Sequence, residues 1–360
     1  MSEAFAIDEG LASAYDFTLP ERLIAAQPAP QRDASRLLVL DGDRIDHRFF
    51  RDLPELFHSG DVLVLNETRV IAARIAGRRA ASGARIELLL LHPLQSMRYD
   101  PNATAWTALA RPAKRIHAGD CIEFPGYGTA EVLGEGDEGI RELRFDINVP
   151  FEEFLNCTGR LPLPPYIHND TDEAQTRYQT VFARIPGSVA APTASLHFTT
   201  ALIDRLVERG TIVVRIALDI GLGTFRPMKT ERIEHHTMHA EHYAISQDAV
   251  DAIEKAKREG RRVIAAGTTV IRALEGNVAT YGRLRAADGV TDLFVRPGFA
   301  FSVVDAAITN FHLPRSTLLV LVSAFAGRER ILAAYRAAID REYRFFSFGD
   351  AMFVTACEPR

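Results

Sequence analysis

The chain has 360 residues, of which 47% are hydrophobic and 25% are charged, and its formal net charge at pH 7 is −5. This is ordinary globular composition, and the net charge gives no overall sign of a nucleic-acid partner. Because the length exceeds the usual size of a single hydrophobic core, we expect two domains.

The N-terminal segment, MSEAFAIDEG, carries acidic residues where a signal peptide carries lysine or arginine. The longest apolar run, from Leu318 to Phe325, falls well short of the ~20 residues that span a bilayer. The cysteines are Cys121, Cys157 and Cys357, and they form no CxxC pair, so neither a disulfide framework nor a zinc knuckle is expected. We therefore expect a cytoplasmic protein without a membrane partner.

The first half of the chain predicts a buried strand followed by a small barrel. Asp61–Leu65 (DVLVL) is a compact apolar run suited to a buried strand, and the polar segment Asn66–Val70 (NETRV) after it suits the rim of a site. Residues 74–155 then show short alternating patterns, such as Ile86, Leu88 and Leu90, separated by Gly- and Asp-containing turns. This spacing is typical of a small β-barrel or sandwich.

Helices and strands alternate in the rest of the chain. The predicted elements are a helix over Thr200–Arg209, a strand over Thr211–Leu218, a helix from the N-cap Ser246 to Gly260, a strand over Arg262–Ala266, a helix from about Thr269, and a late helix with Leu332, Tyr335, Ile339 and Tyr343 on one face. The expected fold class is mixed α/β. A layered main domain, residues 1–73 and 156–360, is interrupted by an inserted β-barrel domain, residues 74–155.

Two glycine-containing segments are candidate sites. Gly187–Thr199 (GSVAAPTASLHFT) places His197 among small residues, and a neutral histidine can remove a proton near pH 7. A lone histidine is more often a structural residue, so both interpretations stay open. Gly221–Pro227 (GLGTFRP) follows an apolar strand, where glycines let a ligand lie close to the backbone, although an ordinary loop has the same composition.

The histidine-rich segment HHTMHAEH contains His235, His236, His239 and His242. His235 and His239 have the i, i+4 spacing that can place two metal ligands on one helix face. The segment lacks the HExxH order of zinc hydrolases, and no cysteine lies nearby. A metal-dependent hydrolase is therefore an alternative function rather than the favoured one.

The segment RRVIAAGTTVIRALE, Arg262–Glu275, predicts a strand that ends at Gly267 and a helix that opens with Thr268 and Thr269. Free N–H groups at such a helix start form a natural anion site, with Arg272 one turn further on. The alternative is an ordinary connection in which a threonine caps the helix. Thr309–Ser316 (TNFHLPRS) also places polar groups directly after an apolar run.

Basic residues gather in two clusters, each of which suits either a phosphate contact or a solvated surface. One comprises Arg111, Lys114 and Arg115, and the other Arg328, Arg330, Arg336, Arg341 and Arg344. The aromatic residues Tyr343, Phe345, Phe346 and Phe348 suit either stacking on bases or a packed core.

Taken in order, these segments resemble the S-adenosylmethionine:tRNA ribosyltransferase-isomerases, a family of queuosine biosynthesis. The matching stretches are collinear over nearly the whole chain: YDFTLPERLIAAQPAPQRDASRLLVL from Tyr15, DVLVLNETRVIAARI from Asp61, RLPLPPYI from Arg160, RYQTVFA from Arg177, GSVAAPTASLHFT from Gly187, GLGTFRPM from Gly221, HTMHAEHY from His236, AAGTTVIRALE from Ala265 and a long run from Thr291 to Val354. Two positions depart from the family pattern, with Asp219 in place of histidine and Ser195 in place of glycine.

The resemblance implies an α/β domain with an inserted β-barrel. This agrees with the alternating helices and strands and with the short strands predicted over residues 74–155. It also implies that S-adenosylmethionine, as a substrate, gives its ribosyl unit to 7-aminomethyl-7-deazaguanine at the wobble position of tRNA. The product is epoxyqueuosine, and adenine and methionine are released. No metal or bound cofactor is implied. The expected partners are tRNAs with GUN anticodons (those for Asp, Asn, His and Tyr), and the expected state is a monomer.

That chemistry assigns roles to residues as hypotheses. A base, His197 or His239, removes a ribose C5′ proton next to the sulfonium, and a second base, Glu241 or Asp350, deprotonates the acceptor amine. Asp219, at the family's histidine position, is a further catalytic candidate. Substrate-binding candidates are Asn66, Arg69, Thr193, Gly223, Thr224, Gly267, Thr268, Thr269, Arg272, Asn310 and His312, and tRNA-binding candidates are Arg111, Lys114, Arg115, Arg328 and Arg344. A non-catalytic RNA-binding protein is the remaining alternative.

Overall fold

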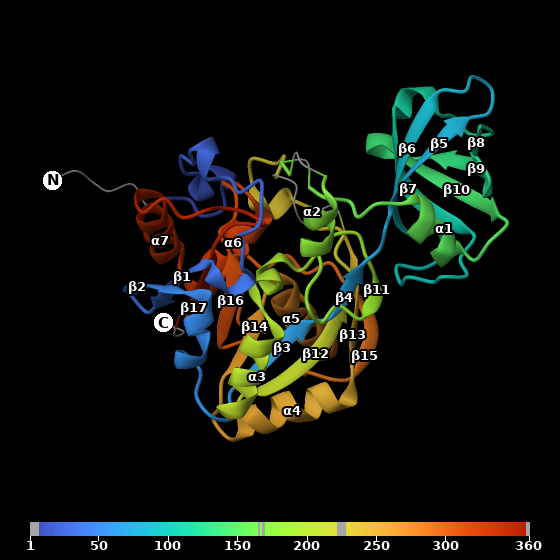
Figure 1. Ribbon diagram of the computed structural model, residues 1–360. Helices are drawn as coiled ribbons and strands as arrows, with labels where there is room; N and C mark the ends of the chain where they lie inside the picture. Colours follow the sequence, from blue (N-terminus) through green and yellow to red (C-terminus); the bar gives the residue numbers. More distant parts are fainter. Residues whose placement is uncertain (1–6, 165, 168–169, 222–227, 358–360) are drawn as a thin grey trace.

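A computed structural model describes residues 7–164, 166–167, 170–221 and 228–357 (Figure 1). The helices are α1 (Phe151–Thr158), α2 (Asp172–Arg177), α3 (Thr200–Glu208), α4 (Gln247–Arg258), α5 (Thr268–Tyr281), α6 (Thr317–Ala326) and α7 (Arg328–Asp340). The strands of the main sheet are β1 (Arg36–Asp41), β2 (Arg44–Phe49), β3 (Val62–Asn66), β12 (Ile212–Leu218), β13 (Glu241–Ile245), β14 (Val263–Ala266), β15 (Ala287–Thr291), β16 (Ala306–Asn310) and β17 (Ala351–Thr355).

The main sheet has nine strands in the order β15-β13-β12-β3-β14-β16-β17-β1-β2. Its centre is parallel, because β12 pairs with β3, β3 with β14, and β14 with β16, all in the same direction. The outer pairs β12–β13, β13–β15, β16–β17 and β1–β2 are antiparallel. The carboxyl ends of the four central strands therefore meet at one edge of the sheet.

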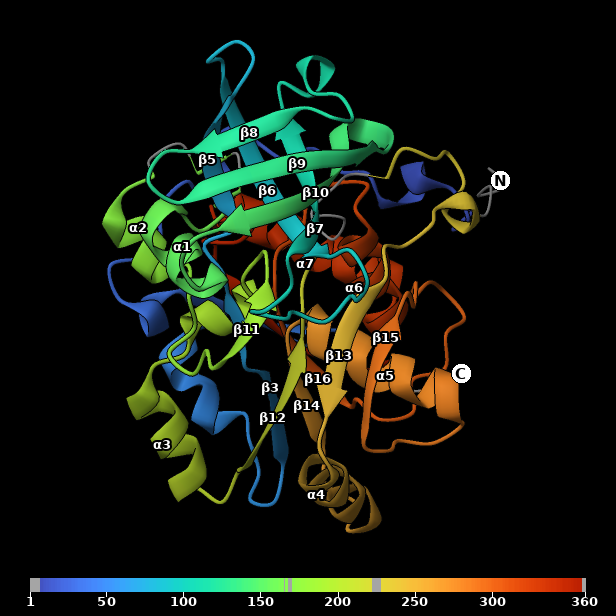
Figure 2. The same ribbon diagram turned by 90° about the vertical axis from the view of Figure 1, so that its right-hand side faces the viewer.

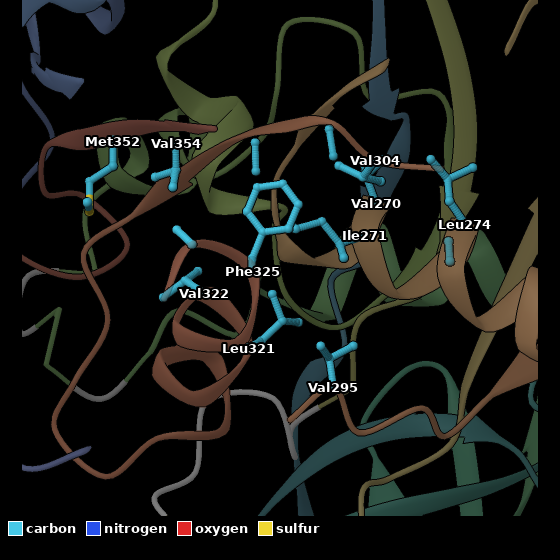
Figure 3. Close-up of a cluster of buried hydrophobic side chains, with 14 of the residues drawn as sticks. Val270, Ile271, Leu274, Val295, Val304, Leu321, Val322, Phe325, Met352 and Val354 are labelled. Atoms are coloured by element: carbon cyan, nitrogen blue, oxygen red, sulfur yellow. The ribbon is translucent and has the colours of Figure 1, made fainter. Parts of the chain in front are cut away.

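Both faces of this sheet are covered, which is why its central strands are continuous apolar runs. Along β3, Val62 and Val64 pack into one core with α4, α5, α6 and α7, whereas Leu63 and Leu65 pack into another with α3. This alternation is the two-residue period of a strand. Figure 3 shows Phe325 of α6 pointing between Ile271 of α5 and Val354 of β17.

A third core lies inside a closed barrel with the strand order β10-β7-β6-β5-β8-β9. Its strands are β5 (Arg74–Arg79), β6 (Arg85–Pro93), β7 (Ala105–Arg111), β8 (Cys121–Phe124), β9 (Gly128–Glu135) and β10 (Ile140–Ile147). Alternate residues of β6 point inward, and Phe151 and Phe154 of α1 pack against the same core. Closure removes the exposed strand edges that promote aggregation.

The segment that enters the barrel and the segment that leaves it are hydrogen-bonded to each other. Strand β4 (Thr68–Val70), which pairs with β11 (Ile185–Ser188), leads from β3 into the barrel, and α1 leads out of it. The segments are joined where Arg74 N donates to Arg160 O at 3.1 Å and Arg160 N to Arg74 O at 2.9 Å. Because β3 ends at the sheet's carboxyl edge, the barrel lies beyond that edge (Figure 2).

The structure confirms the predicted mixed α/β class with a barrel, and the predicted helices and strands agree within about two residues at each end. The domain limits at residues 73 and 155 stay a prediction. The face predicted for the late helix is confirmed only in part, because Tyr335 is buried and Ile339 packs against the core, whereas Leu332 is half-buried. Helix α7 buries Ile331, Ala334, Tyr335 and Ala338, and it ends before Tyr343. The buried face combines the large side chains of Ile331 and Tyr335 with the small Ala334 and Ala338.

Within the described residues, no helix is long and apolar enough to cross a membrane.

Candidate functional site

The carboxyl ends of the central strands bring together polar residues from four distant parts of the sequence. Strand β3 ends at Asn66, Asp219 follows β12, Gly267 follows β14, and β16 ends at Asn310. In open α/β sheets, ligands bind in the crevice outside this edge. The fold therefore places the candidate site between the main sheet and the barrel.

Two cavities adjoin at this edge, and Ile220 lines both. The narrower one, about 30 Å³, is lined by the start of α5 (Gly267, Thr268 and Thr269) together with Thr193, Asn310 and His312. The wider one, about 300 Å³, lies between the barrel residues Leu91, Leu109 and Ile140 and the main-sheet residues Asp219, His239 and His242. The fold thus gathers predicted residues from segments that are far apart in the sequence.

The start of α5 has the geometry predicted for an anion site. Gly267 has a φ of 105°, a left-handed conformation that favours glycine, and it turns the chain from β14 into the helix. Side chains do not cap this helix start. The first N–H groups of a helix lack partners within it, and the helix dipole is positive there. Thr268 and Thr269 border the narrow cavity, so an anionic group fits at this end of it.

Asn66 holds two strands together. Its side chain accepts hydrogen bonds from Leu218 N at 3.0 Å and Thr68 N at 3.1 Å, and it donates to Leu218 O at 3.0 Å. The side chain is completely buried. We conclude that Asn66 shapes the site by fixing β3 to β12.

His197 lies behind Asn310. Its Nε2 is 3.1 Å from Asn310 Nδ2, its Nδ1 is 2.9 Å from Ser35 Oγ, and its ring packs against Phe50. Asn310 in turn accepts a hydrogen bond from Thr193 Oγ1 at 2.9 Å. Burial lowers the pKa of His197 to about 3, so the ring stays neutral.

His312 is a second buried neutral histidine. Its Nε2 is 2.8 Å from Thr309 Oγ1, and burial lowers its pKa to about 3. It borders the narrow cavity, where a neutral ring can take part in hydrogen bonds without adding charge.

A chain of hydrogen bonds runs along the wide cavity. Asp219 accepts from Thr68 Oγ1 at 2.9 Å, and its other oxygen is 3.1 Å from His242 Nδ1. His242 Nε2 is 2.6 Å from Asp288, whose carboxylate also binds Arg98 of the barrel at 2.8 Å. Burial disfavours the charged ring, but the hydrogen bonds to the two carboxylates outweigh it and raise the pKa of His242.

The buried carboxylates of Glu241 and Asp350 bind groups of neighbouring elements. Glu241 forms an ion pair with Arg272 and accepts from Gly221 N at 3.1 Å. Asp350 accepts from Arg36 N at 2.9 Å and from Arg344 N at 2.8 Å. These contacts tie β13 to α5 and β17 to β1, and the proposal that either carboxylate is the second base stays a prediction.

The remaining substrate and base candidates lie in different surroundings. His239 is exposed and lines the wide cavity. Arg69 pairs with Glu152 of α1 at 2.9 Å and so connects the main sheet to the barrel side. Gly223 and Thr224 lie outside the described residues.

The predicted tRNA-binding residues separate into exposed and enclosed groups. Arg111, Lys114 and Arg115 are exposed on the barrel, at the end of β7 and in the turn that follows it. Arg328 is buried, with its guanidinium bound to Glu9 and the carbonyl of Ala14. Arg344 is half-buried and donates to Gln27 O. The aromatic run from residue 343 to 348 is buried and packs in the core, and Phe346 also lines the narrow cavity.

The histidine-rich segment does not form the helix face that a pair of ligands at i, i+4 requires. His235 ends a single 3-10 turn, and the segment before β13 has no helix. The ring of His236 packs against Phe294. Across the described ranges, no group of three or more His, Cys, Asp or Glu residues is arranged to hold a metal ion.

Known proteins match this chain over nearly its whole length. The family model described as "Queuosine biosynthesis protein" matches residues 12–354. The S-adenosylmethionine:tRNA ribosyltransferase-isomerase of Pelotomaculum thermopropionicum is 49% identical over 345 residues, or 95% of this chain and 99% of that protein. Its counterpart from Moorella thermoacetica is 50% identical over 344 residues, or 94% of this chain and 98% of that protein. The chain belongs to the S-adenosylmethionine:tRNA ribosyltransferase-isomerase family.

The family resemblance and the enzyme class predicted from the sequence are thereby confirmed, and the chain is a transferase-isomerase. A crystal structure of S-adenosylmethionine tRNA ribosyltransferase from Thermotoga maritima is 35% identical, with a TM-score of 0.54. The match covers 95% of this chain and 100% of that one, so a solved family relative shares the fold.

Sequence reasoning missed two members of the chain of hydrogen bonds along the wide cavity. Thr68 does not stand out within the NETRV segment, and Asp288 lies in a stretch with no distinguishing pattern. His242 stands out only as part of the histidine-rich segment. The available signal was that an aspartate, Asp219, occupies a position where the family usually has histidine.

Proposed function

We propose that this enzyme transfers and isomerises the ribosyl moiety of S-adenosylmethionine onto 7-aminomethyl-7-deazaguanine at the wobble position of tRNA. The products are epoxyqueuosine-tRNA, adenine and methionine. The observation that carries the proposal is the collinear match, at 46–50% identity, to relatives bearing the ribosyltransferase-isomerase name. The macromolecular substrates we propose are tRNAs with GUN anticodons.

The geometry of the sheet edge supports two substrates that meet there. The free N–H groups at the start of α5 suit the carboxylate of the methionine part, because anions bind at helix N-termini. The wide cavity next to it has room for a ring system between the barrel and the sheet. Since Ile220 borders both cavities, groups bound in them lie side by side.

The reaction requires a base that removes a C5′ proton next to the sulfonium. Of the two histidines proposed for this step, His239 is exposed and lines the wide cavity, whereas His197 is enclosed behind Asn310. We therefore assign the base to His239 and a positioning role to His197, which holds Asn310.

The exposed cations of the barrel suit contacts with tRNA phosphates. Arg111, Lys114 and Arg115 project from the barrel, which lies beyond the same sheet edge as the cavities. A base presented from a single-stranded loop is the usual mode of RNA recognition, and it lets the wobble base reach a cavity while the backbone stays outside.

Adenine release tests the proposal. The purified enzyme is incubated with S-adenosylmethionine, with and without tRNA that carries 7-aminomethyl-7-deazaguanine, and the tRNA is digested to nucleosides for mass spectrometry. We expect adenine release that requires the modified tRNA, together with the mass of epoxyqueuosine. Folded enzyme that binds the tRNA but never releases adenine would instead indicate an RNA-binding protein.

A further inference from the structure

The wide cavity has an apolar wall and an acidic wall. Leu91, Leu109 and Ile140 of the barrel form the apolar wall, which suits the face of a flat ring. Asp219 lies on the opposite wall, and Glu138 also borders the cavity. Glu138 pairs with Lys229, and among the described lining residues there is no lysine or arginine that would pair with Asp219.

Asp219 is held in place by two neighbours, and its carboxylate can still accept further hydrogen bonds. One oxygen accepts from Thr68 and the other is bound to His242, yet each carboxylate oxygen can accept two hydrogen bonds. The side chain is 11% exposed. Gly187 leaves the room that this requires, because a Cβ there would lie 2.6 Å from both oxygens.

His242 completes the arrangement from behind. Both ring nitrogens face carboxylates, and only a ring that carries a proton on each nitrogen donates to both, so the two carboxylates favour the imidazolium and raise the pKa of His242. With this imidazolium, Asp219, His242 and Asp288 together carry one net negative charge. Arg98 binds Asp288 on the outer side, where its own side chain is 66% exposed and solvent screens its charge.

We propose that Asp219, positioned by Thr68 and His242, is a specificity-determining residue that binds the cationic group of a substrate in the wide cavity. This inference rests on the proposed function, whose substrates carry cationic groups: the ammonium of the acceptor base, and the sulfonium and α-ammonium of S-adenosylmethionine. The α-ammonium belongs to the methionine part, whose carboxylate we place at the start of α5, at the narrow cavity. An ammonium donates hydrogen bonds and a sulfonium does not, so the unused lone pairs of Asp219 favour the ammonium.

The test compares ligands that share a ring system but differ in one cationic group. Binding of tRNA carrying 7-aminomethyl-7-deazaguanine is measured against tRNA carrying 7-cyano-7-deazaguanine, which lacks the ammonium, and S-adenosylmethionine against S-adenosylhomocysteine, which lacks the sulfonium charge. For the wild-type enzyme we expect the aminomethyl tRNA to bind about tenfold or more tighter than the cyano tRNA. In Asp219→Asn, which keeps the shape but removes the charge, that preference should fall to within about twofold.

The two ligand comparisons show which cationic group Asp219 binds. If Asp219→Asn instead loses the preference for S-adenosylmethionine over S-adenosylhomocysteine, Asp219 binds the sulfonium. If neither ratio changes in Asp219→Asn, the proposal is overturned. Glu138→Gln is the matched control. It removes the other lining carboxylate, whose charge Lys229 already offsets, and it should leave both ratios unchanged.

Thr68→Val keeps the proposal testable if Asp219→Asn does not fold. Thr68→Val removes one hydrogen bond to Asp219 but keeps its charge, so the preference for the charged ligand should weaken yet remain. An unchanged ratio in Thr68→Val would exclude the positioning role of Thr68. Wild-type enzyme that releases no adenine would contradict the proposed function, whereas active enzyme with unchanged ratios in Asp219→Asn contradicts only this inference.

Discussion

His197 shows how the surroundings of a residue override its usual chemistry. Isolated histidines titrate near neutral pH, which made this one a candidate base. In the fold, both ring nitrogens contact neutral polar groups, Ser35 and Asn310, and only 4% of the residue is exposed. Because burial disfavours the charged form, His197 is a neutral structural group at physiological pH.

Acid should therefore destabilise the fold through His197. In the unfolded chain the ring binds a proton below about pH 6.5, whereas the folded ring does so only near its pKa of about 3. The stabilisation is present above pH 6.5 and is lost as the pH falls toward 3. Between pH 7 and pH 5, its share of the loss is about 2 kcal/mol. Urea unfolding at both pH values should show a smaller loss in His197→Gln, and an equal loss would contradict the assignment.

The buried ion pair between Glu241 and Arg272 gives a second prediction. Each side chain is 2% exposed, so removing one charge leaves the other without its compensating partner in a low-dielectric surrounding. We expect Arg272→Met to lower the free energy of unfolding by about 3–5 kcal/mol.

Denaturant unfolding checks this prediction against a matched control. Arg258 pairs with Glu254 on the exposed surface of α4, so Arg258→Met should cost less than about 1 kcal/mol. Similar losses in the two variants would show that burial does not decide the effect.

At the scale of elements, local patterns predicted most of the fold. The alternation in β6 and the apolar run of β3 reflect which faces of each strand are covered, so they can be recognised without knowing the neighbours. The face of α7 could be recognised only in part in this way. Ala334 and Ala338 are buried in a core that many distant parts of the chain build, which is a tertiary effect.

Gly159 has backbone atoms so close that they leave no room for a side chain. It ends α1 beside the segment that enters the barrel, and a Cβ there would collide with the carbonyl oxygens of Ala72 and Leu155. Since both obstacles are backbone atoms, we expect Gly159→Ala to cost about 2–3 kcal/mol of unfolding free energy. Gly83, in an open turn with φ +67°, is the control, and Gly83→Ala should cost about 1 kcal/mol. A smaller loss for Gly159→Ala than for Gly83→Ala would contradict the predicted collision.

At the scale of the whole molecule, the barrel and the main sheet act as two walls of one site. Ion pairs connect them, including Arg69 with Glu152, Arg98 with Asp288 and Lys229 with Glu138. The cations Arg111, Lys114 and Arg115 lie on the barrel, while α4 lies at the end of the molecule away from it (Figures 1 and 2). Exposed cations therefore lie on the barrel, which is the surface that we propose contacts the tRNA backbone.

Changing the three barrel cations to glutamine should weaken tRNA binding and flatten its dependence on salt. Each phosphate that a cation no longer neutralises should lower the slope of log affinity against log salt by about 0.7–0.9. Binding is measured by filter retention at salt concentrations from about 50 to about 200 mM. The same change of Lys255, Lys257 and Arg258 on α4 is the control and should leave the slope unaltered. Equal effects of the two sets would contradict a barrel docking surface.

The sequence by itself determined the fold class, the family and the strand-to-helix turn at Gly267, because periodicity, turn residues and collinear motifs are local properties of the chain. The tertiary structure alone decided which polar groups face a cavity and which are enclosed. His197 was turned inward behind Asn310, while His242 was placed between Asp219 and Asp288. Protonation and hydrogen bonding depend on neighbours and on burial, and both are fixed only when segments far apart in the chain meet.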